Sequence, residues 1–224
     1  MKYVERLLRN EHGNVTIFAL SIFFLLMLIL FMALFNFSTV FVVKEQASNS
    51  AQQAALAATK VVYDQIEEAI REYDRSLSRL LDPVLIGLLV DEKEASLRAA
   101  HPDWAESEIR YAAIDQVLIH ELPGNAELQG YVAQGLAVAR DEIDDVVATI
   151  IAENHATLEG STIAMFNDDH RIQVQTSVRF ASSVFDFVFL PNPDHEEQVF
   201  QTGQSRPIGF VGEVWDWSDD VISL

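Results

Sequence analysis

The chain has 224 residues, half of them hydrophobic, and its 15 basic and 34 acidic side chains give a formal net charge of −19. This apolar and aromatic content excludes a disordered acidic tail. The acidity argues against nucleic-acid binding, because phosphate contacts need a basic face. The chain contains no cysteine, which removes disulfides, thiol catalysis and cysteine-ligated zinc.

The first predicted elements are a short leader and an apolar membrane helix. Residues 1–13 contain three basic and two acidic side chains, whereas the remainder holds 12 basic and 32 acidic ones. Residues 14–43 carry no charge, and their centre, Ile22 to Phe35, consists only of Phe, Leu, Ile, Met and Ala. About 20 apolar residues cross a bilayer as a helix. Residues 14–43 are therefore predicted to form a transmembrane helix behind a cytoplasmic leader.

An uncleaved anchor explains this segment better than a buried core helix or a cleaved secretory signal. A core helix would be shorter and would show a polar face, and a signal peptide has a shorter apolar region before a small-residue cleavage site. The basic leader places the N-terminus in the cytoplasm and the acidic bulk of the chain outside. Two interpretations stay open for Asn36, Ser38 and Thr39: interfacial depth, or a polar contact with a neighbouring membrane helix.

Residues 44–81 contain neither proline nor glycine and are predicted to continue the helix beyond the membrane. Small side chains recur there at helical spacing and share one face. Such a face lets another helix approach closely, so the sequence predicts a helix-packing surface. Asp82-Pro83 predicts the end of this helix. The alanines of the predicted surface are Ala47, Ala51, Ala54, Ala55 and Ala58.

Residues 82–159 are predicted to stay helical. Val84 to Val90 is either a buried helical turn or a connector, and Asp103 is the expected N-cap of the next helix. A further long helix carries apolar residues at helical spacing from Leu128 to Ile150. We expect a helical hairpin packed against the membrane-proximal helix.

From residue 160 to residue 224 the apolar period changes to two, which is typical of strands with one buried face. The predicted strands are Ser161 to Phe166, Ile172 to Phe180, Ser183 to Leu190, and a pair, Gln198 to Thr202 and Pro207 to Trp215, joined by a turn at Gly203. The predicted fold class is therefore α+β. An N-terminal transmembrane helix continues into a long helix, a helical hairpin follows, and an antiparallel β-sheet ends the chain.

A family resemblance lies in the N-terminal segment. Gly13-Asn14-Val15, the apolar span and Asn49 to Ala58 (NSAQQAALAA) resemble the N-terminal module of TadE-like and TadG-like proteins of the Tad system, which assembles Flp pili. In that family a basic leader ending in glycine precedes a membrane helix and a stretch of the form Leu-Gln-Asn-Ala-Ala-Asp-Ala-Ala-Ala-Leu. The resemblance covers about Arg9 to Thr59. Asn49 and Ala54-Ala55-Leu56 match this stretch, whereas Ala47, Ser48, Gln52 and Gln53 depart from it.

The resemblance implies a possible processing site between Gly13 and Asn14. Prepilins are usually cut after the leader glycine and carry glutamate at the fifth mature position, which here is Phe18. This departure favours an uncleaved TadG-like anchor. Longer TadG relatives also carry a von Willebrand type A domain with an Asp-x-Ser-x-Ser metal site. The sequence contains no such string, so neither that domain nor its metal is implied.

Motifs of catalysis are missing from the sequence. It has no G-x-S-x-G elbow, P-loop, dinucleotide-binding motif or H-E-x-x-H helix. Asp168-Asp169-His170 and Asp194 to Glu197 are interpreted as hydrated loops rather than cation sites. The sequence therefore predicts a protein that is not an enzyme and has no cofactor and no metal. Trp215 and Trp217 are a possible aromatic contact patch, unless a last strand packs one of them inward.

The resemblance implies a non-catalytic, membrane-anchored component of a Tad/Flp-type pilus or secretion assembly. We expect a single-pass protein of the cell membrane with a cytoplasmic N-terminus and an acidic extracytoplasmic domain. Its expected partners are the lipid bilayer and other Tad pilus-assembly membrane proteins, with no nucleic acid, and the N-terminal helix is a candidate for self-association. Two alternatives stay open: a processed minor pilin or pseudopilin within a filament, and a single-pass ligand-binding ectodomain.

Overall fold

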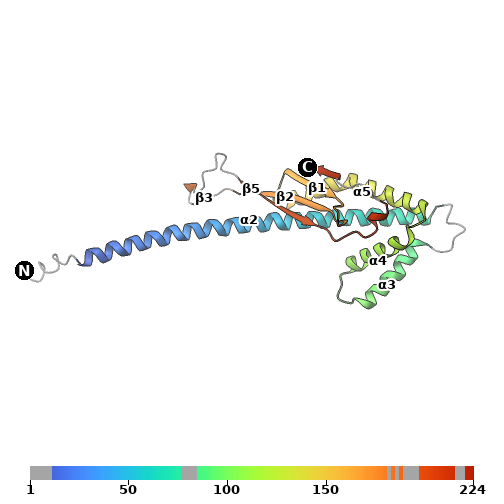
Figure 1. The fold of residues 1–224 in the computed structure, drawn as a ribbon, viewed down its shortest axis with the longest axis horizontal. Helices are drawn as coiled ribbons and strands as arrows, with labels where there is room; N and C mark the ends of the chain where they lie inside the picture. The colour runs from blue at the N-terminus through green and yellow to red at the C-terminus, as the bar shows by residue number, and fades with distance from the viewer. Residues whose placement is uncertain (1–11, 77–84, 181–182, 185–186, 189–196, 215–219) are drawn as a thin grey trace, which may run out of the picture. The chain divides into compact units, whose positions relative to one another are not determined.

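The computed structural model describes residues 12–76, 85–180, 183–184, 187–188, 197–214 and 220–224. It confirms the predicted α+β class, with helices first and an antiparallel sheet last (Figure 1). The chain forms two compact units. The first unit comprises Met1–Val43 and Phe180–Glu197, and the second comprises Lys44–Arg179 and Gln198–Leu224.

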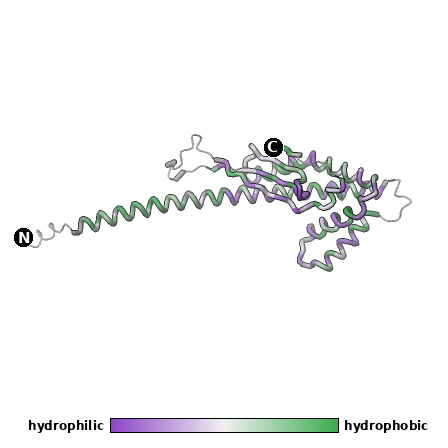
Figure 2. The backbone as a smooth tube through the Cα atoms, in the orientation of Figure 1, coloured by the Kyte–Doolittle hydropathy of each residue, from purple (hydrophilic) through white to green (hydrophobic). Residues whose placement is uncertain are grey.

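The first unit contains the N-terminal part of helix α2, which spans His12–Asp74. From Val15 to Val42 its large apolar side chains are mostly exposed, for example Phe18 at 67% and Phe41 at 69%. Figure 2 shows this stretch as almost continuously hydrophobic. Two short strands, β3 (Ser183–Val184) and β4 (Phe187–Val188), pair antiparallel. The single strand predicted from Ser183 to Leu190 was therefore wrong.

In the second unit, α5 (Ala126–Glu153) packs antiparallel to α2. Asn125 Nδ2 donates to the Tyr73 hydroxyl at 2.8 Å, near the end of α2, and Asn154 Nδ2 donates to Gln53 Oε1 at 3.1 Å, much earlier in α2. Between these points Gly135 lies so close to α2 that an added Cβ would be 3.1 Å from the Ala69 Cβ. Glycine at this position therefore lets the two helices approach closely.

Helices α3 (Ile86–Ala100) and α4 (Glu106–Glu121) form a hairpin. The Asp74 carboxylate accepts hydrogen bonds from the N–H groups of Ile86 at 2.9 Å and Gly87 at 2.8 Å. A carboxylate in this position satisfies two free N–H groups of the first turn of α3 and interacts favourably with its dipole. The last residue of α2 thus fixes where the hairpin starts.

A guanidinium group joins the hairpin to α2. Arg110 on α4 contacts Glu67 on α2 at 3.1 Å, and it contacts Asp91 and Glu94 on α3 at 2.9 Å each. The Arg110 side chain is 31% exposed, so these pairs are only partly screened by water. One cation therefore neutralises carboxylates from two neighbouring helices.

The sheet of the second unit has the order β5-β2-β1-β6. Its strands are β1 (Thr157–Met165), β2 (Gln173–Phe180), β5 (Glu197–Gln204) and β6 (Asp220–Ser223). Ile163 of β1 pairs antiparallel with Val174 on one side and with Ile222 on the other. β5 also runs antiparallel to β2, because Gln204 bonds Gln173 whereas Gln198 lies beside Ser177.

The inner face of the sheet packs on α2 at very short range. Gly203 of β5 is buried, and a Cβ built on it would lie 2.3 Å from the carbonyl carbon and oxygen of Ala51. No side chain fits in that space. Apolar residues of β1 and β2, such as Ile163 and Val174, are fully buried in the same core as Ile66 of α2.

Several local predictions need correction. Helix α2 ends at Asp74, and Asp82 and Pro83 lie outside the described residues. The N-cap of α4 is Ala105, without a side-chain bond, rather than Asp103. Gly203 lies inside β5 and not in a turn. The predicted strand from Pro207 to Trp215 was wrong as well. Its described part contains the 3-10 helix η2 (Val211–Glu213), and β6 forms the last edge of the sheet instead.

The Gly203 contact predicts a large effect of a small substitution. Gly203→Ala should lower the free energy of unfolding by about 3 kcal/mol, because the added methyl group must push β5 away from the α2 backbone. Urea unfolding of the full chain in mild detergent measures this. Gly130, which has open space around its Cβ position, is the matched control, and Gly130→Ala should not destabilise the protein. Equal stability of the two variants would contradict the packing described.

Candidate functional site

The apolar part of α2 is long and apolar enough to cross a membrane. At 1.5 Å per residue, the uncharged residues 14–43 span roughly 45 Å, against roughly 30 Å of hydrocarbon in a bilayer. None of the most apolar stretch is buried by the chain itself. Lipid is the solvent that such a surface fits, because in water it would be a large unpaired apolar area.

Polar groups within this segment find partners inside the helix. The Ser21 hydroxyl donates to the Ile17 carbonyl at 2.8 Å, and the Thr39 hydroxyl donates to the Phe35 carbonyl at 3.1 Å. A hydroxyl bonded in this way can lie in hydrocarbon without a second helix. For Thr39 this supports a satisfied lipid-facing position. The Asn36 side chain lies outside what the structure describes.

The predicted helix-packing alanines all lie in the second unit and are completely buried there. Each of these alanines has an exposed fraction of 0%: Ala47, Ala51, Ala54, Ala55 and Ala58. At Ala51 the α2 backbone itself lies against Gly203 of the sheet. Packing within the chain therefore accounts for this surface, whereas its contact with the helix of a partner stays a prediction.

A buried polar cluster that the sequence did not reveal joins α2, α4 and the segment after β5. The Tyr63 hydroxyl of α2 donates to Asp115 Oδ1 of α4 at 2.8 Å, and Arg206 Nη2, in the segment after β5, donates to Asp115 Oδ2 at 3.0 Å. The Arg206 guanidinium also lies 5.9 Å from the centre of the Tyr63 ring. Tyr111 stacks on the Tyr63 ring at 4.0 Å, and Phe210 meets it edge-on at 6.3 Å.

Burial shifts the titration of this cluster. Desolvation raises the pKa of Asp115 to about 6, although the bonds from Tyr63, Arg206 and the Gly209 backbone act against it. Desolvation, followed by the Asp115 charge, raises the pKa of Tyr63 well above its ordinary value. Asp115 is only 6% exposed, so this carboxylate is closed to a substrate. Its geometry suits a structural lock between α2, α4 and the segment after β5.

A sequence signal for the cluster exists in α4. Asp115 lies three and seven positions before Leu118 and Leu122, which both belong to the buried face of the helix. A carboxylate at such a position needs a buried partner. The partners come from residues 52 positions earlier and 91 positions later, and the periodicity of α4 alone cannot identify them.

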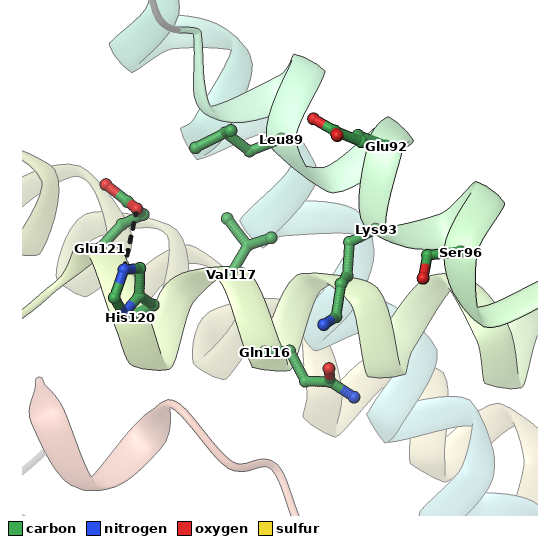
Figure 3. Close-up of a pocket in the computed structure, with 8 residues that line it drawn as sticks. All are labelled: Leu89, Glu92, Lys93, Ser96, Gln116, Val117, His120 and Glu121. Atoms are coloured by element: carbon green, nitrogen blue, oxygen red, sulfur yellow. Dashed lines mark ion pairs between the residues drawn. The ribbon is translucent and has the colours of Figure 1, made fainter.

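The surface of the hairpin carries an open groove of about 360 Å³. Figure 3 shows Leu89 of α3 and Val117 of α4 between the two helices, with polar and charged side chains around them. His120 and Glu121 form a contact of 4.0 Å at one end. The groove combines charges of both signs around Leu89 and Val117, and its geometry indicates no particular ligand.

The remaining predicted site residues fall into two groups. Gly13 and Asn14 belong to α2, but their exposure is not described. Trp215, Trp217 and Asp194 to Glu196 lie outside the described residues. Asp168 to His170 form a tight turn, in which the Asn167 side chain accepts from the N–H of Asp169 at 3.1 Å. Among the described residues no group of three potential ligands could hold a metal ion.

Comparison with protein families agrees with the apolar helix and the alanine-rich turns after it. Residues 13–61 match the family model described as Putative Flp pilus-assembly TadE/G-like. This match confirms the predicted resemblance and covers the membrane-spanning candidate together with the start of α2 in the second unit. A search of curated proteins and of solved structures gave no match. The TadE/G-like match and the apolar helix fit a membrane-anchored pilus component.

The pKa of Asp115 predicts a pH dependence of stability. In the unfolded chain this carboxyl titrates near its ordinary value of 3.8, so the folded protein binds the proton more tightly. Its contribution to stability is fully present below pH 4 and is lost as the pH rises through 6, by about 3 kcal/mol.

The substitution Asp115→Asn should flatten this part of the stability curve, because the buried group no longer titrates. Urea unfolding of the full chain in mild detergent between pH 4 and 7 measures the difference between the two proteins. Glu108→Gln, on an exposed face of the same helix, is the control and should keep the wild-type slope. A flat wild-type curve would contradict the raised pKa.

Proposed function

We propose that this protein is a non-catalytic, membrane-anchored component of a Tad/Flp-type pilus or secretion assembly. The uncharged helix of residues 14–43 holds it in the cell membrane as a single pass, and the acidic second unit lies outside the cytoplasm. Lipid and other membrane proteins of the same assembly are its partners. The observation that carries the proposal is the TadE/G-like match on a helix whose apolar side chains are exposed.

The charge distribution supports the orientation. Lys2, Arg6 and Arg9 precede the helix, and the acidic excess follows it. Basic residues close to a membrane helix stay preferentially on the cytoplasmic side. The second unit therefore faces the cell exterior or the periplasm in this proposal.

The contacts with partner proteins belong to the membrane segment in this proposal. The alanines from Ala47 to Ala58 are buried by their own chain, and a partner helix would reach them only if the second unit opened. In contrast, the side chains of Phe24, Leu28 and Phe31 are more than half exposed and are available to neighbouring membrane helices. Packing between such helices depends on close van der Waals contact and on interhelical hydrogen bonds.

Retention in the membrane is the first test. Leu28→Arg together with Leu30→Arg should move a large fraction of the protein from the carbonate-resistant membrane pellet to the soluble fraction. Each central arginine costs about 3 kcal/mol of insertion free energy. Leu56→Arg is the matched control, since Leu56 is 59% exposed in the second unit and Leu28 is 58% exposed in the first. Extraction of the wild-type protein by carbonate would refute the anchor.

Processing discriminates the anchor from the alternative of a minor pilin. Helix α2 already includes His12, Gly13 and Asn14, and the fifth residue after Gly13 is Phe18 instead of an acidic one. We expect mass spectrometry of the mature protein to recover a peptide that contains the intact Gly13–Asn14 bond. A mature N-terminus at Asn14 would favour the pilin instead. Gly13→Ala gives the matched control, because it should change nothing in an uncleaved anchor.

A further inference from the structure

The sheet of the second unit ends at two strands that carry almost no charge. After Glu197, β5 has only uncharged residues from Gln198 to Gln204, and after Asp220, β6 continues as Val-Ile-Ser. Proteins usually protect an exposed sheet edge with charged residues, proline or bulges. In a chain with a net charge of −19, these two edges lack such protection. Within the described residues no further strand pairs with either one.

On β5, the main-chain groups that point away from β2 belong to identifiable residues. The Ser205 N–H donates to the Ile172 carbonyl at 2.9 Å, so Ser205 points toward β2. Main-chain groups alternate in direction along an antiparallel strand. Gln204 and Thr202 therefore direct their N–H and C=O groups toward the open side.

The same alternation applies to β6. The Leu224 N–H donates to the Ser161 carbonyl at 3.1 Å, so Leu224 points toward β1. Ser223 and Val221 therefore direct their main-chain groups away from the sheet. Both have exposed side chains, and Val221 is 56% exposed. Each edge thus directs a row of donors and acceptors away from the described sheet.

The two edges run in opposite directions. β1 is antiparallel to both β2 and β6, and β5 is antiparallel to β2. β5 and β6 are therefore antiparallel to each other across the sheet. If a second copy lies beside the first in the same orientation, β5 of one copy meets β6 of the other in an antiparallel arrangement.

The register of the sheet also fixes which residues would meet. Val221 pairs with Ala164, Ala164 pairs with Gln173, and the Gln173 side chain accepts from Gln204. These four residues form one row across the outer face of the sheet. The neighbouring row contains Ser223 and Thr162. A sideways shift without stagger therefore places Val221 opposite Gln204 and Ser223 opposite Thr202.

A two-fold pair of β5 strands is less compatible with a membrane anchor. The two-fold axis of such a pair would run perpendicular to the sheet and would reverse every element, including α2. The Ala51 backbone of α2 lies on Gly203, and the strands run along α2 in Figure 1. The Lys44 ends of the two copies would then point in opposite directions. In the sideways arrangement no element is reversed, and only the sheet twist rotates the Lys44 end of each added copy.

We propose that copies of this chain associate side by side, with β5 of one copy pairing with β6 of the next in a continuous antiparallel sheet. This inference rests on the proposed function, because the membrane anchor gives all copies the same orientation. The interface is heterologous, so each added copy leaves one β5 and one β6 free. Such a contact builds an open row or a closed ring.

The absence of native cysteine makes the pairing directly testable. Full-length chains that carry Thr202→Cys or Ser223→Cys, with different tags, are co-expressed and treated in isolated membranes with a short bis-maleimide. We expect a cross-linked dimer that contains both tags when the two variants are mixed. Each variant alone should stay monomeric. A chain with both substitutions should give a ladder of higher oligomers.

Two controls make the result specific. Val138→Cys on α5 is 40% exposed and replaces Ser223→Cys in a matched mixture, which should not cross-link to Thr202→Cys. Gln204→Pro in the Thr202→Cys chain removes an outward N–H beside the cysteine and leaves the main-chain donors toward β2 in place, so this chain should no longer cross-link to Ser223→Cys. Circular dichroism of the purified variants checks that the fold is kept.

Each remaining outcome has a definite meaning. Dimers formed by Thr202→Cys alone would show two-fold pairing of β5 and overturn the proposal, as would monomers in every mixture of folded, membrane-bound protein. Carbonate extraction of the same membranes reports on the anchor separately. Cross-linking in a protein that carbonate releases would support the edge pairing and refute the proposed function.

Discussion

The close contact between Gly203 and Ala51 is the constraint on which the second unit depends. At this point a strand and a helix touch backbone to backbone, with no side chain between them. Because α2 lies so close, the inner face of β5 has room only for glycine at position 203, and α2 must present small residues to the sheet. The buried alanines of α2 and the position of the sheet are thus two sides of the same packing requirement.

Helix α2 changes its chemical surroundings along its length. Up to about Val43 its apolar side chains are exposed, and from Ala47 onward its apolar face is buried by α5 and the sheet. The first part fits lipid, and the second forms the centre of a protein core. The TadE/G-like match covers both parts, so what resembles the family is the transition between them and not the membrane segment alone.

The sequence predicted the features that depend on local pattern. The charge-free run of residues 14–43 and the helical spacing of the alanines placed α2, and the alternation from Ile172 to Phe180 placed β2. Features that depend on distant residues were missed. Nothing local to Pro207–Trp215 reveals that β6 takes the edge of the sheet, and Tyr63, Asp115 and Arg206 come from three separate segments. The spacing of the alanines predicted a packing face, but a pattern of small residues does not say which element covers it.

Because of Arg110, the two sides of the second unit differ in how strongly salt affects their attachment to α2. The α3–α4 hairpin is tied to α2 in part by a partly exposed cation among three carboxylates, whereas the sheet is held by apolar contact and main-chain proximity. Dissolved ions weaken the first kind of attraction and leave the second nearly unchanged. The ionic strength of the surrounding solution therefore acts on the two contacts selectively, because it weakens the attachment of the hairpin while the sheet stays packed on its helix.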